Sequence, residues 1–282
     1  MAIGYDVASA ERGLMDQLVS QLPGMVNELI SEFVSHPVAG DLATFGISQY
    51  TFWMFVGIAI LFVLVFAFAR AQEKTLVPHG AFVNGVEYVI DYVRENVLEG
   101  TVGPTWKQHF PFIATVFFFV LINDILGLIP GAKPGTGSIA VTGAVATCSF
   151  VYFIYVGVRA RGGWGYVKSL APAGVPFPIN LVAWLIEVFS TVLRLVTLAV
   201  RLFCNMFAGH VVMGTFALMA SLFFSQLASG VNASTLQLAG MSVAWELILI
   251  VIYVVEMLVA VVQAYVFSLL SSVYIQLAEQ EE

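Results

Sequence analysis

Three polar side chains interrupt the apolar stretch TLAVRLFCNMFAGHVV (197–212), namely Arg201, Asn205 and His210. An unpaired charge at the centre of a bilayer costs anything from about 3 to well over 10 kcal/mol, so a chain that keeps one has a use for it. An imidazole exchanges protons readily, because its pKa lies near neutral pH. These residue types predict ion chemistry inside a membrane.

The spacing of the ionisable residues before Arg201 predicts a polar stripe on one helix. Glu187, Arg194 and Arg201 are seven residues apart, close to two helical turns, so they share a face. Asn205 lies one turn beyond Arg201, and His210 faces the opposite side. A simpler interpretation remains for three of them: Glu187 and Arg194 form a helix-face ion pair, and the Asn205 amide joins two helices.

A second polar stripe lies on the last apolar run, where Glu256 and Gln263 are seven residues apart and Glu246 lies about a quarter-turn off their face. If the last two runs form an antiparallel hairpin, His210 and Glu256 reach similar depth and form a proton-exchanging pair. Two alternatives stay open: Gln263 serves as interhelical glue, and Glu246 extends to the outer interface.

Asp124 in an earlier run adds an acid toward the outer end, unless it pairs locally with Asn123. Together these groups indicate a route for protons or cations that is broken at Arg201. A continuous chain of titratable groups would leak protons. A fixed cation midway prevents this by repelling H⁺, and it requires a carboxylate from a partner, because no obvious free one lies beside Arg201.

The composition places these residues in a polytopic membrane protein. Of 282 residues, 60% are hydrophobic and 10% charged, and the mean hydropathy is +0.92. The net charge of −7 comes largely from the two ends of the chain and argues against nucleic acid as a partner. Cys148 and Cys204 lack ligand spacing, so we expect small buried residues with no disulfide or metal role.

Five apolar runs predict an all-α integral membrane protein with five crossings: 50–69, 110–130, 138–158, 179–225 and 243–277. The last two are too long for one upright crossing. We therefore expect long, tilted helices that form a hairpin over 179–277 with a polar turn at 225–240.

Two further segments have helical amphipathicity and are too polar to cross lipid. Residues 8–35 predict an extramembrane helix, and residues 79–100 predict a helix on the membrane surface. We expect an N-terminal segment over 1–45 and a membrane domain over 46–282. No apolar region precedes residue 51, so a signal peptide is not expected.

Basic residues in the loops orient the crossings. Arg70 and Lys74 follow the first run, and Arg159, Arg161 and Lys168 follow the third. Both loops should be cytoplasmic by the positive-inside rule. The N-terminus is then outside and the C-terminus cytoplasmic.

The segment TLAVRLFCNMFAGH resembles the signature of subunit a of F-type ATP synthases, R-L-x-x-N-x-x-A-G after a long apolar segment. PINLVAWLIE and QAYVF resemble the flanking blocks of that family. The resemblance covers about residues 45 to 278, and residues 1–45 have no counterpart in it.

The resemblance implies a role for each ion-translocating residue. Arg201 would face the carboxylates of a rotating ring of c subunits, with Gln263 close to it and Asn205 within the signature. Glu187 would belong to a cytoplasmic half-channel. The outer half-channel would contain His210 and Glu256, whose residue types are exchanged relative to many bacterial members, together with Asp124 and Glu246.

The resemblance also implies a stator subunit without a catalytic site or cofactor of its own, in a multi-subunit complex with c-ring subunits and peripheral-stalk b subunits. The implied location is a bacterial plasma membrane, with the mitochondrial inner membrane as the alternative. H⁺ and Na⁺ both stay open, because the binding carboxylate belongs to the ring.

Two other classes of function are compatible with the composition. A secondary transporter would show internal repeats and matching broken spans, and five unequal crossings with two oversized runs do not halve. A passive assembly scaffold would use the polar residues only to join helices. Proton flux after substitution of Arg201 separates this class, because a scaffold keeps the flux.

Overall fold

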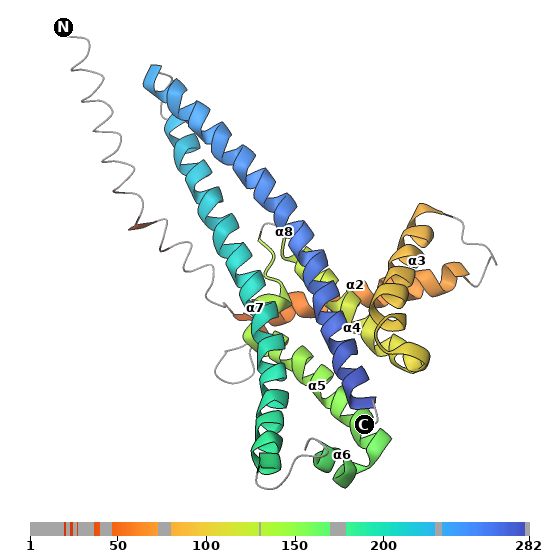
Figure 1. The fold of residues 1–282 in the computed structure, drawn as a ribbon. Helices are drawn as coiled ribbons and strands as arrows, with labels where there is room; N and C mark the ends of the chain where they lie inside the picture. Colours follow the sequence, from red (N-terminus) through yellow and green to blue (C-terminus); the bar gives the residue numbers. More distant parts are fainter. Residues whose placement is uncertain are drawn as a thin grey trace. The chain divides into compact units, whose positions relative to one another are not determined.

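The computed structural model describes residues 37–39, 47–72, 80–129, 131–169, 179–228 and 233–279, with Ser20, Pro23, Gly24 and Asn27. Among these residues, five helices are long and apolar enough to cross a membrane (Figure 1). They confirm the predicted all-α membrane fold: α2 Gln49–Gln72, α4 Trp106–Leu126, α5 Ile139–Arg161, α7 Ile179–Ala228 and α8 Ala233–Glu279.

The last two helices are longer than the sequence predicted. Helix α7 has 50 residues and α8 has 47. At about 1.5 Å per residue each rises about 70–75 Å, more than twice a hydrocarbon core of about 30 Å, so neither can stand upright in a bilayer. The bounds predicted for the turn, 225–240, are wrong, because α7 continues to Ala228 and α8 begins at Ala233. The fall in hydropathy there marks polar composition within the helices.

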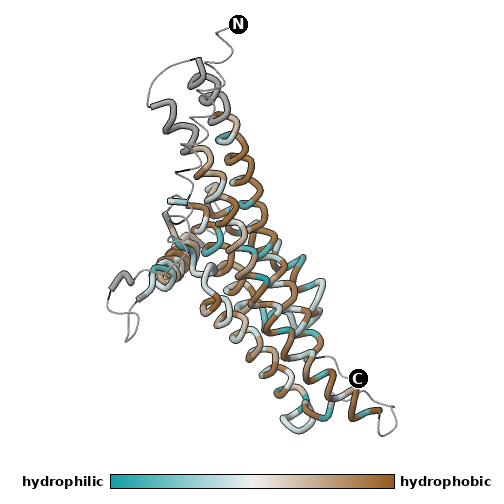
Figure 2. Tube along the Cα trace, turned by 90° about the vertical axis from the view of Figure 1, so that its left-hand side faces the viewer, coloured by the Kyte–Doolittle hydropathy of each residue, from teal (hydrophilic) through white to brown (hydrophobic). Residues whose placement is uncertain are grey.

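The outward surfaces of the long helices suit lipid. In Figure 2 these helices are mostly hydrophobic, with polar residues in short stretches. On α2, Phe62 is 71% exposed and Val63 is 68% exposed. The prediction that Cys148 and Cys204 are buried is wrong: both are free and exposed. An apolar run in a membrane helix does not identify the face that packs, because lipid accepts small apolar side chains as well as a core does.

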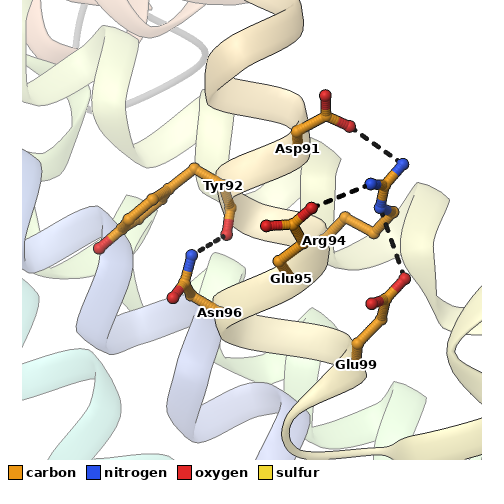
Figure 3. Close-up of polar contacts among 6 residues, drawn as sticks. All are labelled: Asp91, Tyr92, Arg94, Glu95, Asn96 and Glu99. Atoms are coloured by element: carbon orange, nitrogen blue, oxygen red, sulfur yellow. Dashed lines mark hydrogen bonds and ion pairs between the residues drawn. The ribbon is translucent and has the colours of Figure 1, made fainter.

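The predicted helix over 79–100 forms as α3 Ala81–Val93 followed by a π-helical turn, η1 Arg94–Glu99. Its apolar side is anchored by Val93, Val97 and Leu98, all fully buried. On the polar side, Figure 3 shows Arg94 surrounded by carboxylates. The Arg94 guanidinium lies 3.0 Å from Asp91, 3.2 Å from Glu95 and 3.4 Å from Glu99. The helix is thus amphipathic, as its periodicity predicted.

Short elements complete the described chain: the 3₁₀ turns η2 Gly103–Thr105 and η3 Gly135–Gly137, and the helix α6 Gly163–Ser169. Strands β1 Pro37–Ala39 and β2 Ile47–Ser48 pair antiparallel, a small departure from an all-helical chain. Most of the helix predicted over 8–35 lies outside the described residues; its four described positions are helical.

The chain divides into two compact units, one of Met1–Gln49 with Phe207–Leu258 and one of Tyr50–Met206 with Val259–Glu282. The second unit holds a continuous hydrophobic core. Ile113 and Val120 of α4, Leu202 of α7, and Phe267 and Ile275 of α8 are at most 1% exposed within it. The core therefore joins the parts of α4, α7 and α8 that belong to this unit.

Candidate functional site

Arg201 lies on the exposed side of α7, away from the core. Its neighbours Leu198 and Leu202 are 3% and 0% exposed, so they set the rotation of this part of the helix. Among the described residues no carboxylate forms an ion pair with Arg201. The structure thus presents a guanidinium, without an ion pair to any described carboxylate, on an apolar helix surface.

Arg194, two turns earlier on the same stripe, is in a different electrostatic state. Its Nη2 lies 2.8 Å from Oε1 of Glu187, and its guanidinium carbon lies 5.6 Å from the ring centroid of Tyr274 on α8. The ion-pair interpretation of Glu187 and Arg194 is confirmed. The two arginines share spacing and helix, but only the charge of Arg194 is compensated within the described chain.

Tyr166 of α6 lies in the electrostatic field of this pair and was not singled out from the sequence. Burial raises the pKa of the Tyr166 phenol, while the cations Arg194 and Arg161 oppose the rise and Glu187 adds to it. Its ring occupies the space above Gly157 of α5, where any side chain would overlap it. No spacing rule marks Tyr166, because the contact joins a short loop helix to α5.

In the unit that contains Phe207–Leu258, the described parts of α7 and α8 run antiparallel. The rings of Phe216 and Trp245 lie 5.3 Å apart, and the Glu256 carboxyl packs against the backbone of Gly209. This contact brings the Glu256 carboxyl to the level of His210, the residue after Gly209. His210 is half-buried and Glu246 is exposed.

Gln263 of α8 is 8% exposed, and its amide nitrogen has no hydrogen-bond partner among the described groups. A buried donor without a hydrogen-bond partner costs about 1–3 kcal/mol, so this amide is ready to bind a water or an incoming group. Asn205 of α7 is half-buried in the same unit.

Asp124 of α4 is 1% exposed, and neither carboxyl oxygen has a hydrogen-bond partner among the described groups. The local pairing with Asn123 is wrong, because the Asn123 amide donates to the carbonyl of Phe119 at 2.9 Å. The buried hydroxyl of Thr136, in η3, lies beside Asp124 but outside hydrogen-bond geometry.

Two glycines bring backbone close to this buried cluster. A Cβ on Gly57 of α2 would lie 2.9 Å from the Asn123 amide nitrogen, and one on Gly135 of η3 would lie 3.0 Å from its oxygen. The sequence singled out Asp124, but it did not predict that the Asn123 side chain packs against Gly57 and Gly135. It also did not single out Thr136. The cluster gathers α2, α4 and the loop after α4, and no local pattern reports that packing.

No group of three or more His, Cys, Asp or Glu side chains that could hold a metal ion occurs in the described part of the chain. The arrangement suits movement of an ion between single titratable groups. In the second unit these groups include Arg201, which has no ion pair among the described residues, and the buried side chains of Asp124, Thr136 and Gln263, which have polar atoms without a described hydrogen-bond partner.

Residues 51–276 match the protein family described as ATP synthase A chain. A relative from Gluconacetobacter diazotrophicus, named ATP synthase subunit a, is 32% identical over 261 residues, which cover 90% of this chain and 97% of that protein. The subunit a of Gluconobacter oxydans is 34% identical over 254 residues, with the same coverage of 90% and 97%.

A subunit a from Chlorobium phaeobacteroides is 34% identical over 235 residues, which cover 82% of this chain and 64% of that longer protein. The region that matches the family, 51–276, includes Asp124, Glu187, Arg194, Arg201, Asn205, His210, Glu246, Glu256 and Gln263.

Proposed function

The chain belongs to the ATP synthase A chain family, and on this premise we propose that it is the membrane stator subunit that passes protons to and from the carboxylates of a rotating c ring. Members of the family are ion-translocating membrane components of the ATP synthase complex and are not its catalytic subunits. The proposal adds the partners, the path and the residues.

Arg201 is exposed and forms no ion pair with a carboxylate of the described residues, and this observation carries the proposal. A carboxylate approaching Arg201 through lipid is stabilised in its charged form, so it releases its proton there. Once away from Arg201 the carboxylate must be neutral, because a bare charge in hydrocarbon is too costly. Arg201 therefore separates proton release from proton uptake.

The remaining polar groups form two offset half-channels in this proposal. The outer one uses His210 and Glu256, with Glu246 nearer the outer surface. It also uses Asp124, whose carboxyl has no hydrogen-bond partner among the described groups and, with its neighbour Thr136, suits a chain of waters.

The cytoplasmic half-channel begins at Glu187, whose side chain is 42% exposed although it pairs with Arg194. Gln263 and Asn205 supply amides near the level of the arginine. The positive-inside rule supports an outer N-terminus and a cytoplasmic C-terminus in a bacterial plasma membrane. Peripheral-stalk b subunits would hold the stator against the torque of the ring.

Replacement of Arg201 by alanine tests the proposal. Complexes with Arg201→Ala should assemble and hydrolyse ATP but pump no protons. Arg194→Gln is the matched control, because the same stripe loses an arginine that is already compensated; it should keep measurable pumping. Coupled pumping by the Arg201→Ala complex would refute the assignment, and an unchanged proton flux would favour a scaffold.

A further inference from the structure

His109, in the first turn of α4, is buried and is hydrogen-bonded through both ring nitrogens. Its Nε2 lies 2.8 Å from Oε1 of Glu279 at the end of α8, and its Nδ1 lies 3.0 Å from the hydroxyl of Tyr152 on α5. The ring is 5% exposed. None of these residues belongs to the proposed half-channels.

Glu279 is held a second time by Thr105, whose hydroxyl donates to Oε2 at 2.7 Å. An acid in the last turn of a helix is unfavourable by itself, because the helix C-terminus carries partial negative charge. The contacts with His109 and Thr105 offset this cost. They also join residues 170 and 174 positions apart in the chain, so they fix the end of α8 against α4.

The same end of α8 carries Tyr274, which lies against the Arg194–Glu187 ion pair. The Tyr274 ring lies 5.9 Å from the ring of Phe153, the neighbour of Tyr152 on α5, and it lies under the Arg194 guanidinium at 5.6 Å. Arg194 in turn holds Glu187. A displacement of the last turns of α8 would therefore reach Glu187 through Tyr274 and Arg194.

We propose that His109, Thr105, Tyr152 and Glu279 form a positioning network for the cytoplasmic half-channel. The network holds the last turns of α8 so that Tyr274 stays under Arg194 and the Arg194–Glu187 pair keeps its geometry. Helix ends open easily unless they are anchored, and a buried network anchors well only when every member has its partner. This inference rests on the function proposed above.

The test is passive proton flux through membrane sectors in vesicles, measured as a function of pH on the cytoplasmic side, with the amount of assembled complex measured in parallel. His109→Phe keeps an aromatic ring and removes both hydrogen bonds. It should assemble and lower the flux at least about threefold, because even one lost hydrogen bond produces an effect of that size and two are lost. It should also shift the pH profile, because Glu187 changes its surroundings.

Ser149→Ala is the matched control. It removes the buried 2.8 Å hydrogen bond between Ser149 of α5 and Ser271 of α8 without touching the end of α8, and its pH profile should equal that of the wild type. If His109→Phe does not assemble, Thr105→Val replaces it, because valine keeps the shape and removes only the bond to Glu279. The same shift is then expected.

A double-mutant cycle identifies the route of the effect. In a Tyr274→Leu background, His109→Phe should cause no further shift of the pH profile. A wild-type profile for the assembled single variant, an additive effect with Tyr274→Leu, or an equal shift in Ser149→Ala would each overturn the inference. Failure of the proposed function looks different, because wild type and Arg201→Ala would then conduct alike.

Discussion

Gly209 of α7 has no side chain, and the Glu256 carboxyl lies in the space that a Cβ would occupy. Gly209→Ala therefore perturbs the proposed outer half-channel by adding a single carbon atom. The added Cβ would lie 2.6 Å from Cδ and 2.8 Å from Oε1 of Glu256, whereas nonbonded carbons prefer about 3.5–4.0 Å. The carboxyl must therefore retreat by about 1 Å or more.

The effect on stability should be small. Overpacking costs typically about 1–3 kcal/mol, but the atoms that clash are at the end of a flexible side chain. Alanine also improves helix propensity over glycine by about 1 kcal/mol. The two terms largely cancel, so we expect Gly209→Ala to assemble at the wild-type level.

The effect on proton transfer should be large. A proton acceptor must lie within about 2.6–3.2 Å of its donor, and a displacement of about 1 Å costs up to about 100-fold in rate. We expect ATP synthesis driven by an imposed proton gradient to fall about 10- to 100-fold in vesicles that contain Gly209→Ala.

Glu256→Asp in the same chain provides the rescue, because it withdraws the carboxyl by one methylene, about 1.5 Å. The Gly209→Ala/Glu256→Asp variant should recover much of the rate. Gly143→Ala on α5 is the control, since its Cβ would meet nothing within 4 Å. A wild-type rate for Gly209→Ala, or an equal loss in Gly143→Ala, would show that the position of this carboxyl does not limit proton entry.

Thr136→Val removes a buried hydroxyl that makes no hydrogen bond to the described groups, so thermal unfolding of the complex should be unchanged while proton flux falls. An unchanged flux would exclude Thr136 from the path. Gly57→Ala places a Cβ 2.9–3.1 Å from the Asn123 amide between two packed helices, so the thermal midpoint should fall by the equivalent of about 1–3 kcal/mol; an unaltered midpoint would contradict the close packing. Arg194→Gln breaks a pair whose side chains are 26% and 42% exposed, so it should cost at most about 1 kcal/mol in stability; a larger loss of assembled complex on gels would show that Glu187 is less hydrated than its exposure indicates.

The sequence alone determined the elements and the class of chemistry. Hydropathy and helical periodicity are local properties, so the five crossings, the amphipathic helix containing Val93 and the stripe through Glu187, Arg194 and Arg201 followed from windows of residues. Composition also excluded a soluble protein, because a soluble core of this size could not bury apolar runs of such length. The family resemblance, confirmed by comparison with known relatives, rested on the same local segments.

Spacing placed Arg194 and Arg201 on one stripe and left a Glu187–Arg194 ion pair as an open interpretation. Only the tertiary structure showed that this pair forms and that Arg201 has no ion pair among the described residues. It also showed the buried surroundings of Asp124 and the contact of Glu279 with His109, 170 residues away. Such contacts depend on how each helix is rotated and how deeply it packs. Those quantities are set by the whole core, and no local window of sequence contains them.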